Sequence, residues 1–297
     1  MSTDSSISLS EYIRNREFRQ GMIWPPGMRR IVMAVEYDGS AFQGFQVQKQ
    51  GTLTVQDVIQ KALSFVADEP ITLVCCGRTD SGVHATQQII HFDTLASRPM
   101  RAWQRGVNTR LPAQVRVLWA KEVEPGFHSR FSALSRTYSY LILNTAVHSA
   151  IYRSIITCIK EPLDAKSMHE AAQFLVGEHD FSSFRAAQCQ ANHPVRTVTQ
   201  VDVQKRGAVL KVQITANAFL YNMVRNIVGS LVDVGNGKYP IAWFKDVLES
   251  CDRTVASMKA PANGLYFVGV DYGPAYPWPE LQIKQPLLWP GEHLEFA

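Results

Sequence analysis

Hydrophobic periodicity after residue 28 predicts a run of alternating strands and helices. Four strands are expected where apolar positions alternate or form short runs, at 30–36, 71–76, 88–92 and 115–120. A helix should begin after Thr54, because Asp57 three residues later completes a capping-box arrangement and an apolar stripe follows. Another helix is expected at about 100–109. The order of this first run is therefore β-α-β-β-α-β.

The rest of the chain repeats this order with one additional helix. Four strands are again expected from alternating apolar positions, at 138–143, 198–203, 210–214 and 265–270. Lys205-Arg206-Gly207 marks a hairpin between the second and the third of these strands. Helices are expected at 165–176, 219–232 and 241–250, with Gly177 closing the first. No residue-level repeat accompanies this order, so the repeat is one of architecture.

Each β-α-β-β-α-β run has the element order of a ferredoxin-like unit. We therefore predict an α+β fold in which two such units lie side by side, with an extended mixed or antiparallel sheet, a central cleft and flanking helices. The expected parts are a poorly ordered N-terminal extension, a first half, a second half and a Pro/Trp-rich tail, with bounds 1–28, 29–125, 126–273 and 274–297. Function is expected in the cleft between the halves.

Composition favours a well-packed chain in a reducing compartment. Of the 297 residues 46% are hydrophobic and 19% charged, which is enough apolar material for a sizeable core. The five cysteines include no CxxC pair, which argues against a disulfide framework or a zinc site. No apolar run approaches the roughly 18 residues of a membrane span, so a cytoplasmic protein is expected. The net charge of +4 favours an anionic partner only slightly.

The segment Gly77-Arg78-Thr79-Asp80-Ser81-Gly82 is predicted to be a loop, because it lies between two apolar strands. Its two glycines permit a tight backbone path. On local chemistry alone it is typical of an ordinary turn, where Asp, Ser and Gly are common for conformational reasons. The alternative is that Asp80 is a catalytic carboxylate.

Arg225 favours the catalytic interpretation of the loop. It lies among the apolar positions of the helix predicted at 219–232, where burying a charge is expensive unless a carboxylate answers it. A side chain that reaches the surface would avoid that cost. If Arg225 is buried, we predict Asp80 as its partner. The pair would lower the Asp80 pKa and keep the carboxylate ionised as a nucleophile or a base.

Six segments in order between residues 30 and 272 resemble the TruA family of tRNA pseudouridine synthases. The loop from Gly77 to His84 is similar to the family's catalytic signature, GRTDxGVH. The other five segments are Glu36-Tyr37-Asp38-Gly39-Ser40 with Phe42, Gly44, Phe45, Gln46 and Gln48; 127–133 with Arg136, Tyr138 and Tyr140; 180–185; 217–229; and 260–266. Two small departures occur, since Phe45 replaces a frequent Trp and Ser81 a frequent Ala.

The resemblance implies an enzyme, active as a homodimer, that isomerises uridine to pseudouridine at positions 38, 39 and 40 of the tRNA anticodon stem-loop after flipping the base. It assigns Asp80 as the essential catalytic carboxylate and Arg225 as its ion-pair support. It assigns Tyr138, Arg78 and Leu265 as substrate-binding residues, and it implies no cofactor, metal or membrane contact. Attack of Asp80 at C1′, its addition to C6 and its removal of the C2′ proton all stay open.

Candidate phosphate contacts are the arginines on and beside the helix predicted at 100–109, namely Arg98, Arg101, Arg105 and Arg110. Arg101 and Arg105 share a helix face, although a solvated helix surface gives the same pattern. His84 is expected to be a hydrogen-bonding scaffold. Two rival functions stay open: a catalytically idle RNA-binding or tRNA-chaperone module, and a glycosidic-bond hydrolase that uses Asp80 with Asp38.

Overall fold

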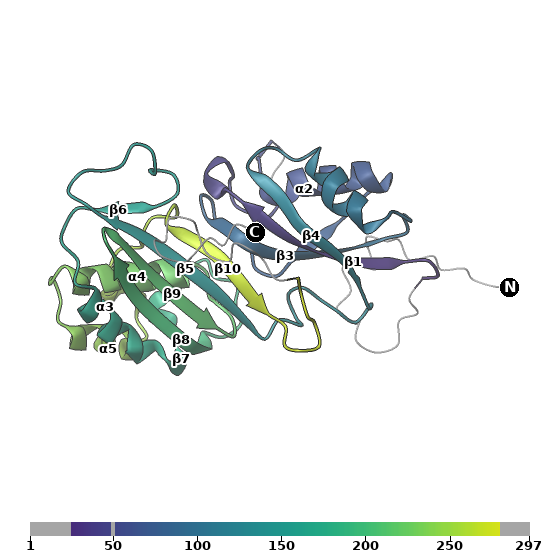
Figure 1. Cartoon of the computed structure of the whole chain (residues 1–297). Coiled ribbons are helices and arrows are strands. Elements are labelled where there is room, and N and C mark those ends of the chain that lie inside the picture. Colours follow the sequence, from purple (N-terminus) through teal and green to yellow (C-terminus); the bar gives the residue numbers. More distant parts are fainter. Residues whose placement is uncertain (1–24, 49–50, 280–297) are drawn as a thin grey trace.

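The computed structural model describes residues 25–48 and 51–279, which form a ten-stranded mixed sheet with helices packed on it (Figure 1). The strands are β1 Arg29–Tyr37, β2 Leu73–Cys75, β3 His84–Thr94, β4 Val115–Val123, β5 Ser135–Asn144, β6 Thr157–Ile159, β7 Gly177–Asp180, β8 Val195–Arg206, β9 Val209–Ala216 and β10 Leu265–Asp271. The α-helices are α2 Val55–Ala67, α3 Ala165–Ala172, α4 Met223–Gly235 and α5 Ile241–Ser250. The predicted α+β class with an extended mixed sheet is confirmed.

The first half has the strand order β4-β1-β3-β2, with antiparallel pairing throughout. Helix α2 begins where the sequence predicts, because the Thr54 hydroxyl accepts the Asp57 N–H at 3.3 Å. The helix expected at 100–109 is less regular, since Ala102–Gly106 is a π-helical turn around the fully buried Trp103. Most of the expected N-terminal extension, positions 1–24, falls outside the described residues.

The second half has the order β10-β5-β9-β8, again antiparallel, and β7 extends its edge. Three predicted details are wrong. The helix expected at 165–176 ends its α-helical part at Ala172 and continues as a 3₁₀ turn, and Gly177 begins β7 instead of capping it. Helix α4 begins at Met223 instead of residue 219, because Asn222 adopts a left-handed conformation with φ 61° that interrupts the helix. Strands β6 and β7 are additional to the expected ones, since segments this short show no periodicity.

The halves meet where β3 pairs with β10 in parallel, with His84 opposite Tyr266 and Ala85 opposite Phe267. Strand β1 occupies the whole of one edge of β3. The other edge is shared by β2, which pairs near the end of β3, and β10, which pairs at its beginning. The loop 76–83 joins β2 to β3, so it lies in the gap between β2 and β10 at the seam of the two halves.

Each half has its own hydrophobic core, and the loop at the seam belongs to both. Cys76 and Ala85, at the two ends of the loop, pack in the core of the first half. Val83 packs in the core of the second half together with Leu265. The loop is therefore fixed by both cores. No helix among the described residues is long and apolar enough to cross a bilayer.

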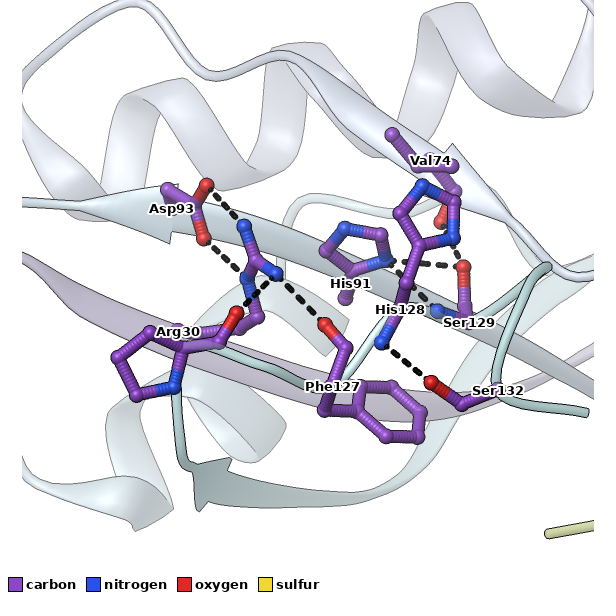
Figure 2. Close-up of polar contacts among 9 residues, drawn as sticks. Arg30, Val74, His91, Asp93, Phe127, His128, Ser129 and Ser132 are labelled. Carbon is purple, nitrogen blue, oxygen red and sulfur yellow. Dashed lines mark hydrogen bonds and ion pairs between the residues drawn. The ribbon is translucent and has the colours of Figure 1, made fainter. Parts of the chain in front are cut away.

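The connection between the halves is anchored by a buried ion pair (Figure 2). Arg30 of β1 donates from Nε and Nη2 to the two carboxylate oxygens of Asp93 on β3, both at 2.7 Å. Its Nη1 donates to the carbonyls of Pro125 and Phe127 at 2.7 and 2.6 Å. Both charged side chains are buried, and the pair is satisfied at every carboxylate oxygen. The segment that leads into β5 is thereby held against the sheet of the first half.

Candidate active site

The loop that carries Asp80 is clamped by two buried side chains of neighbouring strands. The Gln88 amide of β3 donates to the Gly77 carbonyl at 2.6 Å and accepts the Gly77 N–H at 3.3 Å. The hydroxyls of Tyr37, at the end of β1, and Thr79 lie 2.8 Å apart. Because Gln88 and Tyr37 are themselves almost fully buried, the backbone just before Asp80 has little freedom.

The segment 39–45 packs against the other side of this loop, and two glycines make the approach close enough. A Cβ added at Gly39 would overlap the Val83 carbonyl. Gly44 has φ 89°, and a Cβ there would lie 3.0 Å from the Thr79 carbonyl oxygen. That same carbonyl accepts the Phe45 N–H at 3.0 Å. The glycines of this segment therefore allow the close packing that positions the Asp80 loop.

Asp80 and Arg225 are brought together, as the sequence predicts, by the seam between the halves. Arg225 Nη1 lies 3.8 Å from Asp80 Oδ2, and the side chains are 12% and 26% exposed respectively. This distance is an ion pair without a hydrogen bond. Within the described chain, neither carboxylate oxygen of Asp80 accepts a hydrogen bond. The carboxylate is thus held near a cation while its lone pairs stay available to another molecule.

Arg225 takes its own hydrogen bonds from the protein instead. Its Nε donates to the Ala260 carbonyl at 2.8 Å, and its Nη1 donates to the Asn222 side chain at 3.2 Å. The Ala260 N–H in turn donates to the Arg225 carbonyl at 3.0 Å. These contacts orient the guanidinium beside Asp80 and offset part of the cost of burying it.

The electrostatics of Asp80 differ from the sequence-based expectation. Burial raises the Asp80 pKa, and the nearby Arg225 and Lys259 lower it by less, so the pKa stands above its ordinary value. The predicted lowering by Arg225 has the right sign, but desolvation outweighs it. Burial likewise lowers the Arg225 pKa, with Asp80 acting in the opposite direction.

Tyr138 of β5 lies beside the Asp80 loop, with its ring in an aromatic cluster. The ring makes edge-on contacts with Phe219 and Phe267, with centroids 4.9 and 5.0 Å away. A Cβ added at Gly77 would lie 3.6 Å from the Tyr138 hydroxyl, which places that hydroxyl at the loop. Burial raises the Tyr138 pKa well above its ordinary value, and the negative charge of Asp80 adds to the effect. The hydroxyl therefore keeps its proton at neutral pH.

The other two expected substrate-binding residues lie in different surroundings. Arg78 is exposed at the surface of the Asp80 loop, and no described residue pairs with its side chain. Leu265, the first residue of β10, is 6% exposed and packs in the core of the second half opposite Tyr140. Arg78 is thus free to contact a ligand, whereas Leu265 is almost fully buried in the core.

His84 bridges the two halves behind the loop, as expected of a scaffold. Its Nδ1 lies 3.0 Å from the Gly39 nitrogen and 3.1 Å from Asp38 Oδ1, and its Nε2 lies 3.1 Å from the Ser154 carbonyl. The His84 ring also stacks on Tyr266. The hydrogen bond with His84 holds the Asp38 pKa well below its ordinary range. Asp38 is therefore engaged in structure, which weighs against the hydrolase that would need it as a second carboxylate.

The four candidate phosphate-binding arginines are all exposed, around the π-helical turn that packs on α2 and β4. Two of them are engaged: Arg98 Nε donates to the Val66 carbonyl at 3.0 Å, and Arg110 lies 3.7 Å above the Phe65 ring. Arg101 and Arg105 have no side-chain partner within the described residues. They are not part of the cluster around Asp80.

A family model for tRNA pseudouridine synthase matches residues 33–132 and 171–273. The chain belongs to the tRNA pseudouridine synthase family. Relatives named tRNA pseudouridine synthase A include those of Hydrogenovibrio crunogenus, 51% identical over 88% of this chain and 99% of the relative, and of Shewanella loihica, 50% identical over 86% and 97%. The Escherichia coli O1:K1 / APEC protein is 48% identical over 86% of this chain and 94% of its own length.

The chain is accordingly an isomerase of this family, and the matched residues include both Asp80 and Arg225. A solved structure, that of a Cbf5-Nop10-Gar1 complex, aligns with 80% of this chain and 49% of its own. Its TM-score of 0.33 and its 12% identity are too low to support an argument. Among the described residues, no group of three or more His, Cys, Asp or Glu side chains is arranged to hold a metal ion.

Two residues of the site give no signal in the sequence. Gln88 lies at a strand position, where a polar residue attracts no attention, yet it clamps the loop together with Tyr37. Lys259 precedes the anchor residue Ala260 and is close enough to Asp80 to lower its pKa. The resemblance covers 260–266, so it stops one residue short of this lysine.

Proposed function

We propose that this protein isomerises uridine to pseudouridine at positions 38, 39 and 40 of the tRNA anticodon stem-loop, with Asp80 as the catalytic carboxylate. The observation that carries the proposal is the state of Asp80. Its carboxylate is partly buried at the seam, 3.8 Å from Arg225, and accepts no hydrogen bond within the described residues. A carboxylate held only by charge keeps its lone pairs for the substrate.

The chemistry needs little else from the protein. The N1–C1′ bond of uridine breaks, a C5–C1′ bond forms, the hydrogen of C5 leaves and N1 gains a proton, so the product is an isomer. The target nucleotide must leave its stack to bring the sugar to Asp80. Attack at C1′, addition to C6 and removal of the C2′ proton each require an ionised Asp80. The raised Asp80 pKa makes the contribution of Arg225 and Lys259 important, because both favour that form.

Further parts of the proposal rest on the architecture and on the family. Each half is interpreted as a ferredoxin-like unit, which the repeated strand orders β4-β1-β3-β2 and β10-β5-β9-β8 support. Residues 29–125 and 126–273 are taken as these units, and the anticodon arm is placed in a cleft along their seam. A homodimer is carried over from the resemblance alone, and light scattering measures its mass. The cytoplasmic location is carried over from the sequence, in which no apolar run is long enough to span a membrane.

The test of the proposed function is formation of pseudouridine in an unmodified tRNA transcript that carries uridines at positions 38 to 40. With tritium at C5 of uridine, turnover releases the label to water, and carbodiimide-dependent primer stops locate the product. Release of tritium with stops at those positions is expected. Tight tRNA binding without release would instead support the idle RNA-binding or chaperone module, and free uracil would support a hydrolase.

Tyr138 is proposed to stack on the flipped uracil, and two substitutions with different expected results test this role. Tyr138→Phe keeps the ring between Phe219 and Phe267, whereas Tyr138→Leu removes it. We expect Phe to keep tRNA affinity and Leu to lose about 1–3 kcal/mol of binding free energy. Filter binding measures the affinity, and tritium release measures turnover. Normal binding with no turnover in the Phe variant would show a chemical role of the hydroxyl, and near-wild-type behaviour of both would exclude both roles.

Arg101 and Arg105 are proposed to bind phosphate, because both are exposed and neither guanidinium has a partner among the described residues. Replacing both with Gln should weaken tRNA binding and flatten its salt dependence. The slope of log K against log salt should fall by roughly 0.7–0.9 for each phosphate that the variant no longer binds. Arg116→Gln is a matched control, because Arg116 is exposed but donates to the carbonyls of Pro112 and Val115. An unchanged slope in the double variant would identify a solvated helix surface.

A further inference from the structure

Residues 257–260 form a short segment that is fixed at both ends against helix α4. At one end, the Ser257 N–H donates to the Ser230 hydroxyl at 3.2 Å, and the Ser257 hydroxyl donates to Asp233 at 2.7 Å. At the other end, Ala260 exchanges two hydrogen bonds with Arg225. Two residues, Met258 and Lys259, lie between these anchors.

The close approach of this segment to α4 depends on Gly229. A Cβ at Gly229 would overlap the Met258 carbonyl oxygen, so any other residue would push the segment away. The backbone of Met258 therefore lies directly on the helix that carries Arg225. The backbone of the segment, with Met258 and Lys259 at its tip, is thus fixed on the helix whose Arg225 lies 3.8 Å from Asp80.

The two side chains at this tip face away from the protein. Met258 is 90% exposed, more than any other large hydrophobic residue among those described. Lys259 is also exposed, and no described residue forms a hydrogen bond or ion pair with its ammonium group. A single exposed apolar residue is ordinary on a protein surface. Met258 differs in that its backbone is fixed against α4 and its neighbour is a cation that is unpaired among the described residues.

The charged groups around Lys259 favour binding of an anion. Lys259 lies close enough to Asp80, Arg225 and Arg253 for each to influence its pKa, which burial and the two arginines lower and Asp80 raises. Arg253 donates to the Asn226 side chain and to the Ala256 carbonyl, so it pairs with no acid there. Among the groups that influence Lys259, Asp80 is thus the one negative charge beside two arginines. A phosphate group would restore the balance.

We propose that Met258 and Lys259 form an RNA-binding tip, in which Lys259 binds a phosphate flanking the flipped uridine and Met258 packs on the base exposed by the flip. This inference rests on the proposed function, because the flipped nucleotide is what brings a phosphate to this position. A nucleotide that leaves the stack exposes an apolar base face beside it, and methionine is one of the side chains that proteins insert at such steps.

The test combines substitutions in the protein with neutral phosphates in the RNA. tRNAs are made with a methylphosphonate on the 5′ side or the 3′ side of the target uridine, and their affinities for wild-type protein and for Lys259→Gln are measured. Each change alone is expected to weaken binding several-fold. At one of the two phosphates the effects should not add, because the methylphosphonate removes the interaction that Gln has already removed. Full additivity at both phosphates would overturn the assignment of Lys259.

Met258 is tested by Met258→Ala against Leu95→Ala, a control at an exposed leucine of the first half. Met258→Ala should weaken binding about fivefold or more, as expected when a base loses its packing partner, and the control should leave it unchanged. Equal effects of the two substitutions would overturn the role of Met258. Melting temperatures confirm that both variants are folded. These are binding measurements, so wild-type protein that binds the tRNA but releases no tritium would refute the proposed function separately.

Discussion

Asp80→Asn should abolish pseudouridine formation while changing tRNA affinity by less than about 1 kcal/mol, roughly fivefold in Kd. The amide has the shape of the carboxylate but cannot act as a nucleophile or a base. It also preserves the loop, whose clamps at Gly77 and Thr79 do not involve the Asp80 side chain. Tritium release under single-turnover conditions measures the chemical step, and filter binding measures affinity. Turnover by the pure variant would remove Asp80 from the mechanism.

The same substitution has a second expected result, in stability. Because the Asp80 pKa is raised in the folded protein, its contribution to stability is fully present below the ordinary carboxyl pKa and is lost as pH rises through the folded pKa. Asparagine resembles the protonated carboxyl and does not titrate. Asp80→Asn should therefore be more stable than wild type at neutral pH, and the difference should disappear on acidification. Urea unfolding at several pH values measures this, and a variant less stable at neutral pH would show that Arg225 outweighs burial.

Local signals in the sequence predict much of this fold, and their failures have local causes. The N-cap at Thr54 fixes the start of α2, because its hydrogen bond with the Asp57 N–H is made within four residues. The apolar pattern places the start of α4 four residues too early, because Phe219 and Leu220 continue a pattern that the left-handed Asn222 interrupts. A pattern of apolar residues records burial, and it does not record the backbone conformation of one residue.

The site is predictable from the sequence where a charged residue lies among apolar ones. A charge at Arg225 in an apolar helix requires a partner, and the structure supplies Asp80. The sign of the net Asp80 pKa shift is not predictable, since it depends on how far burial outweighs two cations. Gly229 is a similar case. Glycine is required there because the backbone of Met258 lies directly against it. The two residues are far apart in the chain, so no local sequence pattern reveals this requirement.

Arg225→Met should nearly eliminate activity at neutral pH, and part of it should return as pH rises. Arg225 lowers the Asp80 pKa against the effect of burial, so its removal raises that pKa further. Only the ionised carboxylate is active, and the rising limb of the pH–rate profile should therefore move to higher pH. Arg225→Lys separates charge from anchoring. The lysine keeps a cation but loses the hydrogen bonds by which Ala260 and Asn222 orient the arginine. The rising limb of the pH–rate profile should therefore move less in Arg225→Lys than in Arg225→Met.

The pairing itself is measured by the double variant. Arg225→Met leaves a partly buried carboxylate without its nearest cation, whereas adding Asp80→Asn removes that charge. The effects of the two substitutions on the unfolding free energy should therefore couple by about 0.5–3 kcal/mol, with the double variant more stable than additivity predicts. This coupling free energy should lie below the roughly 3–5 kcal/mol that breaking a fully buried ion pair costs, because Asp80 is 26% exposed and lies 3.8 Å from Arg225. Strictly additive effects on the unfolding free energy, together with an unmoved pH limb in Arg225→Met, would mean that Arg225 supports α4 and the 257–260 segment without acting on Asp80.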